Sequence, residues 1–377
     1  MNVDALAAAV EDGSVDTVLL GFTDMQGRLQ GKRLHGRHFL DDVATSGSSA
    51  CTYLLVADAE MMVQGRYATT QWDTGYADMV MRPDLATLRS VPWQPGTAMV
   101  LADLETTGGE PVYVSPRQIL RRQLDRLAAL DLTAYGLAGH GLTAYAGTEL
   151  EFVLYKDSYE QAFDKHYRDL IPANQYNVDY SLLGTARVEP LLRRIRNDMY
   201  GAGLLPESAK GECNFGQHEI AFRYDEALKA ADNHVIYKNG AKEIAAQEGM
   251  ALTFMAKPNE REGNSCHIHF SLRNAEESGG DGRSAMLGDG PAHLSVTGQR
   301  VLAGLLATMR EFSVLFAPNI NSYKRYAPGS FAPTALRWGV DNRTCALRIA
   351  GHGQGMRVEN RVPGGDVNPY LAIAALI

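Results

Sequence analysis

The chain is predicted to have an α+β fold in two domains. Its 377 residues exceed the roughly 250–300 residues beyond which one hydrophobic core usually splits. Residues 1–110 have the pattern of short strands and turns, whereas residues 111–377 alternate strand and helix patterns. We therefore expect a small, mainly β domain over residues 1–110, followed by a larger mixed domain over residues 111–377.

Residues 16–35 predict a β-hairpin. The segment VDTVLLGF is rich in strand-forming residues, Gly27 marks the turn, and the return segment ends in basic residues. Residues 48–114 hold further short strand patterns, separated by turn residues in MRPD, VPWQPG and TGGEP. At Ser115 and Pro116 the pattern changes, because serine is a good N-cap and proline fits the first helical position. A helix is therefore expected from Pro116.

In the second domain, strand and helix patterns alternate. Asp225 is expected to cap the longest helix. The tetrapeptide LTAY, which occurs at 132–135 and again at 142–145, and the Gly/Asp/Ser-rich residues 274–292 are expected to be loops. The chain ends inside a short helix pattern after Asn368, and we expect further residues beyond it because so short a helix is marginal. The expected strands are 147–155, 251–258, 265–272, 343–351 and 356–362, and the expected helices are 189–203, 225–249 and 301–316.

Composition narrows the class of protein. Hydrophobic residues make up 45% and charged residues 21%, as in ordinary soluble globular proteins. The net charge of −8 disfavours nucleic-acid binding, which usually needs a basic face. No apolar run is long enough to span a bilayer, and no leader pattern is present. The four cysteines, at 51, 213, 266 and 345, form no CxxC pair, so free thiols and a cytoplasmic location are expected.

Two strand patterns each carry a pair of potential metal ligands at alternate positions. They are Glu149 and Glu151 in GTELEF, and His267 and His269 in SCHIHF. Alternate residues of a strand point to the same side, about 6–7 Å apart. The residues between and beside them are apolar, so each strand has one polar and one apolar face. Carboxylates at this spacing are better placed to bind one ion each than to share one, which indicates two metal ions.

Three further sets of acidic or basic residues lie in segments that also carry apolar residues. Taken singly, such a set is more often the solvated face of an amphipathic sheet, and a His-x-His pair more often forms hydrogen bonds than binds a metal. Their recurrence together favours a reactive cavity. Carboxylates with one imidazole suit Mg²⁺ or Mn²⁺ better than zinc, and arginines beside two divalent ions suit phosphoryl transfer. The sets are Glu212 and Glu219; Arg357, Glu359 and Arg361; and Arg325, Arg343 and Arg348.

No GxxxxGK[ST] motif is present, so a nucleotide would have to be held on a sheet instead of a P-loop.

Six segments of the chain resemble, in order and approximate spacing, the signature blocks of class I glutamine synthetases. The segments are GTELEF, NFGQHEIAFRY, SCHIHFSL, NSYKRYAPGSFAPT, NRTCALRI and RVENRVPGGDVNPYLA. The resemblance covers nearly the whole chain, because TDMQGRLQGKRL and the PD of MRPD are also similar to the N-terminal domain of that family.

The resemblance implies an N-terminal β-grasp domain and a catalytic domain whose antiparallel sheet lines the active site. It also implies a dodecamer of two hexameric rings, with active sites between subunits, and ATP as co-substrate. Two Mg²⁺ or Mn²⁺ ions per active site are implied as well. The implied ligands are Glu151, Glu212 and Glu219 for the first ion, and Glu149, His267 and Glu359 for the second.

The same blocks imply roles for other residues. The nucleotide site would contain Glu207, Tyr224, His269, Ser271, Arg348 and Arg357. The glutamate site would contain Gly263, Arg325, Arg343 and Arg361. Arg343 and Arg348 are also implied to act in catalysis, through contacts with phosphates.

The chain departs from the family pattern where ammonium would bind. Phe331 stands where glutamine synthetases have a flap glutamate that accepts a proton from ammonium, and a phenylalanine offers at most an aromatic face. The FDGSSI segment is absent, and Asp58 in LLVADAEM is the candidate replacement for its aspartate. Glu262 stands where the family has an asparagine that contacts glutamate, which makes the acid substrate less certain than the metals.

We therefore expect an ATP-dependent ligase that joins glutamate to a primary amine larger than ammonia through γ-glutamyl phosphate, similar to glutamate–ethanolamine and glutamate–polyamine ligases. A polyamine would need several acids, for which Asp58, Glu60 and Asp73 are candidates, whereas the uncharged tail of a small monoamine needs fewer and is favoured. Two alternatives stay open. One is a true glutamine synthetase in which Phe331 only packs. The other is a non-catalytic relative, which the six retained ligand positions disfavour.

Overall fold

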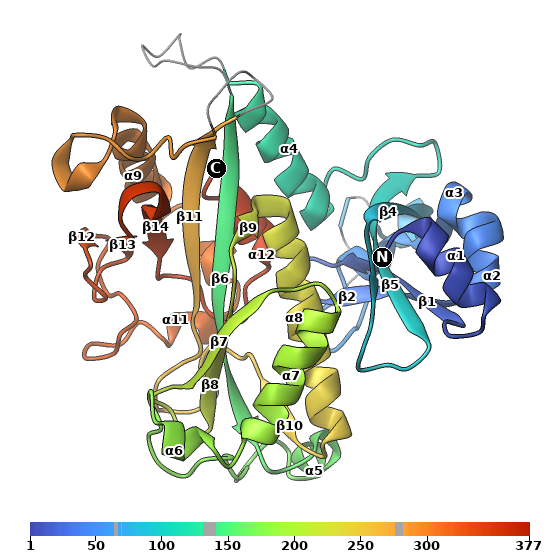
Figure 1. The fold of residues 1–377 in the computed structure, drawn as a ribbon, viewed down its shortest axis with the longest axis horizontal. Coiled ribbons are helices and arrows are strands. Elements are labelled where there is room, and N and C mark those ends of the chain that lie inside the picture. Colours follow the sequence, from blue (N-terminus) through green and yellow to red (C-terminus); the bar gives the residue numbers. More distant parts are fainter. Residues whose placement is uncertain (64–66, 69, 131–140, 276–281) are drawn as a thin grey trace. The chain divides into compact units, whose positions relative to one another are not determined.

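The computed structural model describes residues 1–63, 67–68, 70–130, 141–275 and 282–377 (Figure 1). The chain forms two compact units. The first contains residues 1–119, 193–205 and 235–244, and the second contains residues 120–192, 206–234 and 245–377. Within the described residues, no helix has the length and apolarity needed to cross a membrane.

The first unit is built on a five-stranded sheet with the order β2-β1-β5-β4-β3. The strands β1 and β5 are parallel, and the other neighbours are antiparallel. The bounds are β1 Thr17–Thr23, β2 Leu29–His35, β3 Ser48–Cys51, β4 Asp78–Ser90 and β5 Thr97–Thr106, with helix α1 over Val3–Glu11 and short helical turns over 36–46, 52–55 and 72–74. Leu6 and Val10 of α1 are buried in one cluster with Val18 and Leu20 of β1, which anchors the helix to the sheet.

The predicted hairpin over residues 16–35 is confirmed as β1 and β2. Its turn is organised by the buried Asp24, whose carboxylate accepts hydrogen bonds from the backbone N–H groups of Gln26 and Arg28. The guanidinium of Arg28 forms an ion pair with the same carboxylate at 2.8 Å. Gly27 has a φ of 77°, a left-handed conformation that glycine adopts without steric strain. The turn therefore forms where the sequence places a glycine three residues after an aspartate.

The second unit is built on a nine-stranded sheet with the order β12-β13-β14-β11-β6-β8-β7, and β9 and β10 also pair with β6. Its long central strands, β6 and β11, run side by side in Figure 1. The strand bounds are β6 Leu142–Tyr155, β7 Pro206–Gly211, β8 Gln217–Phe222, β9 Asp225–Glu226, β10 Ala251–Thr253, β11 Cys266–Asn274, β12 Trp338–Val340, β13 Leu347–Ala350 and β14 Arg357–Asn360. The helix bounds of the remaining chain are α4 Pro116–Ala128, α5 Tyr159–Asp164, α6 Leu182–Thr185, α7 Glu189–Gly201, α8 Ala227–Gln247, α9 Val296–Thr308, α10 Ser313–Phe316, α11 Ile320–Tyr323 and α12 Pro369–Ala374.

One face of the β6–β11 pair forms the core of this unit, as the alternation predicts. Leu150, Phe152 and Leu154 are buried on β6, and Ile268 and Phe270 are buried on β11. Burial of these apolar side chains fixes the register, because a slip of one residue would turn all of them to the opposite face. The polar partners of the alternation are thereby held on the other face.

Several sequence-based boundaries are wrong. The second LTAY copy, 142–145, begins β6 and is not a loop, because Ala144 is buried and pairs with Leu272 of β11. The first copy lies outside the described residues. Asp225 does not cap α8, because it pairs with Ala146 as part of β9. The predicted helix 301–316 is two helices, and the first begins earlier because Ser295 caps it through the N–H of Gly298.

Two other predictions are confirmed. Helix α4 begins at Pro116, as expected. The four cysteines are free thiols, as expected.

Three predicted strands are shorter than expected. Strand β14 ends at Asn360, so Arg361, which the sequence places on the same strand as Glu359, lies just beyond the strand. The strands predicted over 251–258 and 343–351 are shorter than expected, because pairing lasts only over 251–253 and 347–350.

Candidate active site

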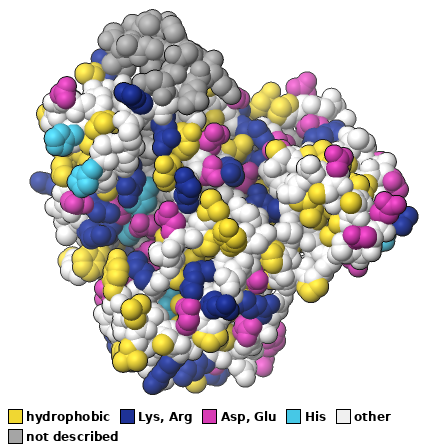
Figure 2. Space-filling view, in the orientation of Figure 1, with side chains coloured by type: hydrophobic (Ala, Val, Ile, Leu, Met, Phe, Trp, Pro, Cys, Tyr) yellow, Lys and Arg dark blue, Asp and Glu magenta, His cyan; other side chains and the backbone are white. Residues whose placement is uncertain are grey.

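The strand register brings the predicted ligands together on one face of the second sheet. Glu149 of β6 lies opposite His267 of β11, and Glu151 lies opposite Glu219 of β8. His269 of β11 lies opposite Glu359 of β14. Residues separated by 118 positions, such as Glu149 and His267, are therefore neighbours. Figure 2 shows histidine, acidic and basic side chains gathered in one region of this unit.

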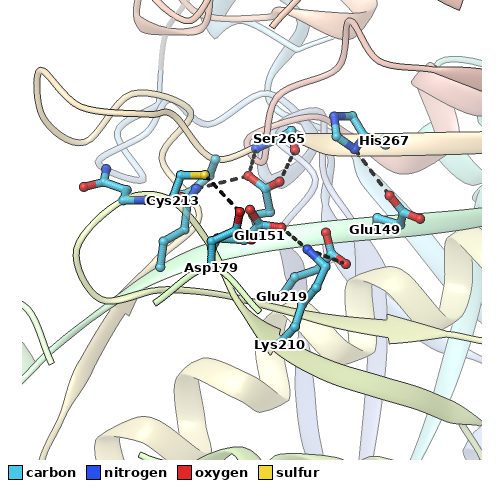
Figure 3. Close-up of polar contacts among 12 residues, drawn as sticks. Glu149, Glu151, Asp179, Lys210, Cys213, Glu219, Ser265 and His267 are labelled. Atoms are coloured by element: carbon cyan, nitrogen blue, oxygen red, sulfur yellow. Dashed lines mark hydrogen bonds and ion pairs between the residues drawn. The ribbon is translucent and has the colours of Figure 1, made fainter. Parts of the chain in front are cut away.

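We define the first cluster as the carboxylates of Glu151, Glu212 and Glu219, which offer oxygens within 4.8 Å of one another. Glu151 is held by the backbone N–H of Ser265 at 2.7 Å and by the hydroxyl of Ser265 at 2.5 Å, as Figure 3 shows. The side-chain amide of Gln217 donates a third hydrogen bond to it at 3.1 Å. Burial raises the pKa of the Glu219 carboxyl to about 8. The charge and hydrogen bond of Lys210 lower this pKa, but they do not offset burial and the negative charges of Glu149 and Glu151.

The residues of the first cluster fit a cation. Three carboxylates this close repel one another unless a positive charge lies among them. In the structure, the ammonium of Lys210 plays that part, since it contacts Glu212 and lies 3.4 Å from Glu219. All-oxygen donors are the ligands that Mg²⁺ and Mn²⁺ prefer. The cluster therefore has the chemistry of a divalent-cation site.

We define the second cluster as Glu149, Glu359 and the two histidines beside them, His267 and His269. Oxygens of Glu149 and Glu359 and a nitrogen of His269 lie within 4.8 Å of one another. The Nδ1 atom of His267 is 3.3 Å from Glu149 and 3.6 Å from Glu359. Burial alone would raise the pKa of the Glu149 carboxyl, but the hydrogen bonds of the two histidines hold it well below its ordinary value.

Hydrogen bonding separates the roles of the two histidines. The guanidinium of Arg357 donates to Nδ1 of His269 at 2.9 Å, so this nitrogen accepts. The other ring nitrogen, Nε2, must then carry the proton and donate to Glu149 at 2.8 Å. With both nitrogens of His269 engaged, His267 is the imidazole better placed to bind an ion between Glu149 and Glu359.

Glu359 is fully buried at the centre of an arginine network. Arg348 contacts one of its oxygens through Nε, and Arg361 donates to the other at 2.5 Å. Burial alone would raise the pKa of the Glu359 carboxyl, but the neighbouring histidines and arginines lower it. The Nε atom of Arg361 is buried without a hydrogen-bond partner among the described residues, which is the state expected of a donor that serves a ligand.

A pocket of about 290 Å³ opens beside the second cluster. Five of the six residues predicted for the nucleotide site line it, and Glu149 belongs to both the pocket and the cluster. The five are Glu207, Tyr224, His269, Ser271 and Arg357. The sixth, Arg348, does not line the pocket, because its guanidinium is bound to Glu359 and, at 3.0 Å, to Asp341.

Tyr145 and Arg273 are among the pocket residues that the sequence analysis does not predict. The guanidinium of Arg273 lies 4.5 Å from the ring centroid of Tyr145 and donates to the hydroxyl of Tyr224 at 2.9 Å. Arg273 could have been predicted from the sequence, because it continues the alternation of His267 and His269 along β11. Tyr145 was missed because its tetrapeptide was interpreted as a loop.

The predicted glutamate-site residues have varied surroundings. Arg325 is buried and donates to the carbonyl of Val362 at 2.9 Å. Gly263 packs against it so closely that a Cβ atom would lie 2.6 Å from Cγ of Arg325. The side chain of Glu262 is exposed, and its backbone carbonyl accepts a hydrogen bond from Asn214. Arg343 is also exposed.

The two predicted amine-site residues belong to different units. Phe331 is 60% exposed on the segment between α11 and β12. Asp58 belongs to the first unit, where its carboxylate accepts hydrogen bonds from the backbone N–H groups of Glu60 and Met62. Its local role is therefore to close a turn.

Comparison with known proteins agrees with this geometry. Residues 113–377 match the family model for the catalytic domain of glutamine synthetase. A gamma-glutamylethanolamide synthetase, GlnA4, of Streptomyces coelicolor is 62% identical over 377 residues, covering 100% of this chain and 78% of that protein. A glutamate–isopropylamine ligase of a Pseudomonas species is 40% identical over 370 residues, covering 97% and 77% of the two chains.

Solved structures give the same relationship for the fold. A chain described as a GmaS/ADP complex superposes with a TM-score of 0.80 at 28% identity, covering 98% of this chain and 79% of that chain. An apo GmaS structure without ligand superposes with a TM-score of 0.79 at 29% identity. Together with the carboxylate clusters, these likenesses establish that the chain belongs to the glutamine synthetase family.

Proposed function

We propose that the protein is an ATP-dependent glutamate–amine ligase that forms γ-glutamyl amides. The observation that carries the proposal is that two clusters of potential metal ligands share strand β6, through Glu149 and Glu151, and that the second cluster adjoins a pocket, in a chain that has Phe331 instead of a flap glutamate. The clusters and pocket support ATP-driven activation of a carboxylate, and Phe331 supports a changed nucleophile. The names of the ethanolamide synthetase and the isopropylamine ligase agree with both parts.

In this proposal, Glu151, Glu212 and Glu219 bind the first metal ion, and Glu149, His267 and Glu359 bind the second. Bound Mg²⁺ or Mn²⁺ would neutralise phosphate charge and polarise the substrate carboxylate. Ser265 and Gln217 fix the orientation of Glu151, and the arginines around Glu359 offset its buried charge. Such supporting hydrogen bonds tune the affinity of a metal site.

ATP is proposed to bind in the pocket lined by Tyr224, Ser271 and Arg357, with its phosphates towards Glu149. Arg325 and Arg361 are proposed to hold the carboxylates of glutamate beside Gly263, with Arg343 contributing from its exposed position, and the unpartnered Nε of Arg361 supports a ligand there. The γ-carboxylate of glutamate then attacks the terminal phosphorus of ATP, which yields γ-glutamyl phosphate and ADP. The neutral amine attacks the acyl carbon, phosphate leaves as the C–O bond breaks, and the amine nitrogen loses a proton to give the amide.

The amine is proposed to be a small monoamine. Ethanolamine and isopropylamine, the amines in the names of the two relatives, each carry one ammonium group and a short tail. Phe331 offers such a tail an aromatic surface, and Asp58 is the proposed acid for the ammonium group. We further propose domain limits of 1–110 and 111–377, and assembly into the dodecamer of the family with active sites between subunits.

The proposal predicts the outcome of an amine panel. ADP release would be measured with ATP, Mg²⁺ and glutamate in the presence of ammonia, ethanolamine, isopropylamine and putrescine. We expect a small monoamine to give the highest kcat/KM and ammonia to be a poor substrate. A protein for which ammonia is the best amine would instead be a glutamine synthetase.

Two variants at position 331 test whether this residue determines the amine preference. Phe331→Glu restores the flap carboxylate and is expected to raise the rate with ammonia relative to ethanolamine, because the new charge can bind ammonium. Phe331→Leu keeps an apolar residue and is expected to retain the amine preference. An unchanged preference in Phe331→Glu would count against a role for this position in choosing the nucleophile.

A further inference from the structure

Lys210 lies in the middle of the first cluster. It is on β7, directly opposite Glu219 on β8. Its ammonium contacts the Glu212 carboxylate and is 3.4 Å from the Glu219 carboxylate, and Figure 3 shows it directed at Glu219. The side chain of Lys210 is only 21% exposed, so it is held among these groups and is not an ordinary surface lysine.

The charge balance of the cluster depends on this lysine. Glu151 is stabilised by neutral donors, Ser265 and Gln217. Glu212 and Glu219 instead share the ammonium of Lys210. Buried carboxylates need a positive charge or several hydrogen bonds, and Lys210 supplies the positive charge for two of the three.

A metal ion and this ammonium cannot use the same oxygens together. A small divalent ion binds carboxylate oxygens at about 2.0–2.1 Å. An ammonium that still contacted Glu212 would then lie within a few ångströms of the ion, and the two positive charges would repel strongly. Lys210 must therefore leave the carboxylates when the metal binds.

The structure provides a position for the displaced charge. The Nζ atom of Lys210 is already 5.1 Å from the ring centroid of Tyr180. An ammonium within about 6 Å of an aromatic face is stabilised by the ring, and Tyr180 is 70% exposed. A rotation of the lysine side chain towards Tyr180 would release Glu212 and Glu219 without moving the backbone.

We propose that Lys210 is a built-in counter-cation of the first cluster, which the metal ion must displace and which thereby sets the metal affinity of that cluster. The inference rests on the proposed function, because it takes Glu151, Glu212 and Glu219 as the ligands of the first ion. Lys210 is here a positioning residue that acts through Glu212 and Glu219.

The test is a titration of the full chain with Mn²⁺, followed by electron paramagnetic resonance of the free ion. Lys210→Met removes the competing charge and keeps the length of the side chain, and we expect it to bind Mn²⁺ at the first site at least about tenfold more tightly. Lys210→Arg keeps the charge and is expected to bind no more tightly than the unaltered protein. Lys229→Met is the matched control, because Lys229 is 60% exposed and pairs with Asp225, which is not a member of the cluster.

A second measurement separates this role from a merely structural one. Without metal, Lys210→Met is expected to melt at a lower temperature, because Glu212 and Glu219 lose their counter-cation. Saturating Mn²⁺ is expected to raise its melting temperature by more than it raises that of the unaltered protein. A lysine that only supported the fold would lower both melting temperatures without tightening Mn²⁺ binding, and that result would overturn the inference.

The variant Glu212→Gln distinguishes a failure of the counter-cation inference from a failure of the metal assignment. If it removes one Mn²⁺ site while Lys210→Met leaves the affinity unchanged or weaker, the counter-cation inference is wrong and the metal assignment stands. If it removes no Mn²⁺ site, the metal assignment of the proposed function is wrong, and the inference fails with it.

Discussion

Glu151 illustrates how a single side chain is prepared for its role. Its two oxygens receive three hydrogen bonds, from the N–H and hydroxyl of Ser265 and from the amide of Gln217. All three donors are neutral, and together they fix the orientation of the carboxylate. The residue can therefore present a negative charge to a cation without reorganising.

Replacing this carboxylate gives a direct prediction. Glu151→Ala is expected to reduce turnover more than about 100-fold, because the first ion loses a ligand and supporting changes alone cost 10- to 100-fold. Steady-state kinetics measures the loss, and circular dichroism checks that the fold is retained. Glu311→Ala, at an exposed position on the chain after α9, is the control and should behave like the unaltered protein. Near-normal activity in Glu151→Ala would refute the ligand assignment.

Strand β11 is the element that connects the cation clusters with the pocket. His267 faces the second cluster, His269 lies between that cluster and the pocket, and Ser271 and Arg273 line the pocket. All four follow one alternation, while Ile268 and Phe270 are buried on the opposite face. One strand therefore connects the second cluster with the pocket.

The contribution of Arg273, the last residue of this alternation, to ATP binding can be tested. Arg273→Ala removes the guanidinium that contacts Tyr145 and Tyr224, and we expect ATP to bind about 2- to 30-fold more weakly, corresponding to the roughly 0.5–2 kcal/mol of a cation–π contact. Isothermal titration with ATP and Mg²⁺ provides the measurement, with the exposed Arg310→Ala as control. Equal affinity in the two variants would show that Arg273 has no part in the pocket.

The sequence predicts features that depend on local periodicity and misses those that depend on register. The two-residue alternation of Glu149 and Glu151 is a local property, so both faces of β6 were predicted correctly. The contact between Lys210 and Glu219 exists only because β7 and β8 pair in one particular register. No periodicity within either strand contains that information.

At the scale of the whole molecule, the chain combines an N-terminal sheet unit with a unit that carries both clusters and the pocket. The α+β class and the family were predicted from the ordered blocks, and the family match confirms them. The assignment of Asp58 to the amine site stays a prediction. The sequence shows an acid near a missing motif, whereas its carboxylate is engaged with the backbone of its own turn.

Stability of the whole chain should report on ligand binding. With ATP and Mg²⁺ each at about one hundred times its dissociation constant, we expect stabilisation of about 2.7 kcal/mol for each and a higher melting temperature. Adding EDTA should remove most of the effect of ATP, because the phosphates and the second cluster would then lack a shared cation. Differential scanning fluorimetry measures both steps. A melting temperature that rises equally with ATP in EDTA would contradict a metal-dependent nucleotide site.

Glu149 has a consequence that extends beyond its own contacts. The same carboxylate lines the pocket and belongs to the second cluster. Whatever occupies one of these places changes the charge that the other experiences, so the two binding events share a coupling free energy. Thermodynamics requires that coupling to be reciprocal: the factor by which an ion strengthens nucleotide binding equals the factor by which the nucleotide strengthens ion binding. A single acidic side chain can therefore make the cell's supply of divalent cations and its supply of ATP act on this protein as one combined signal.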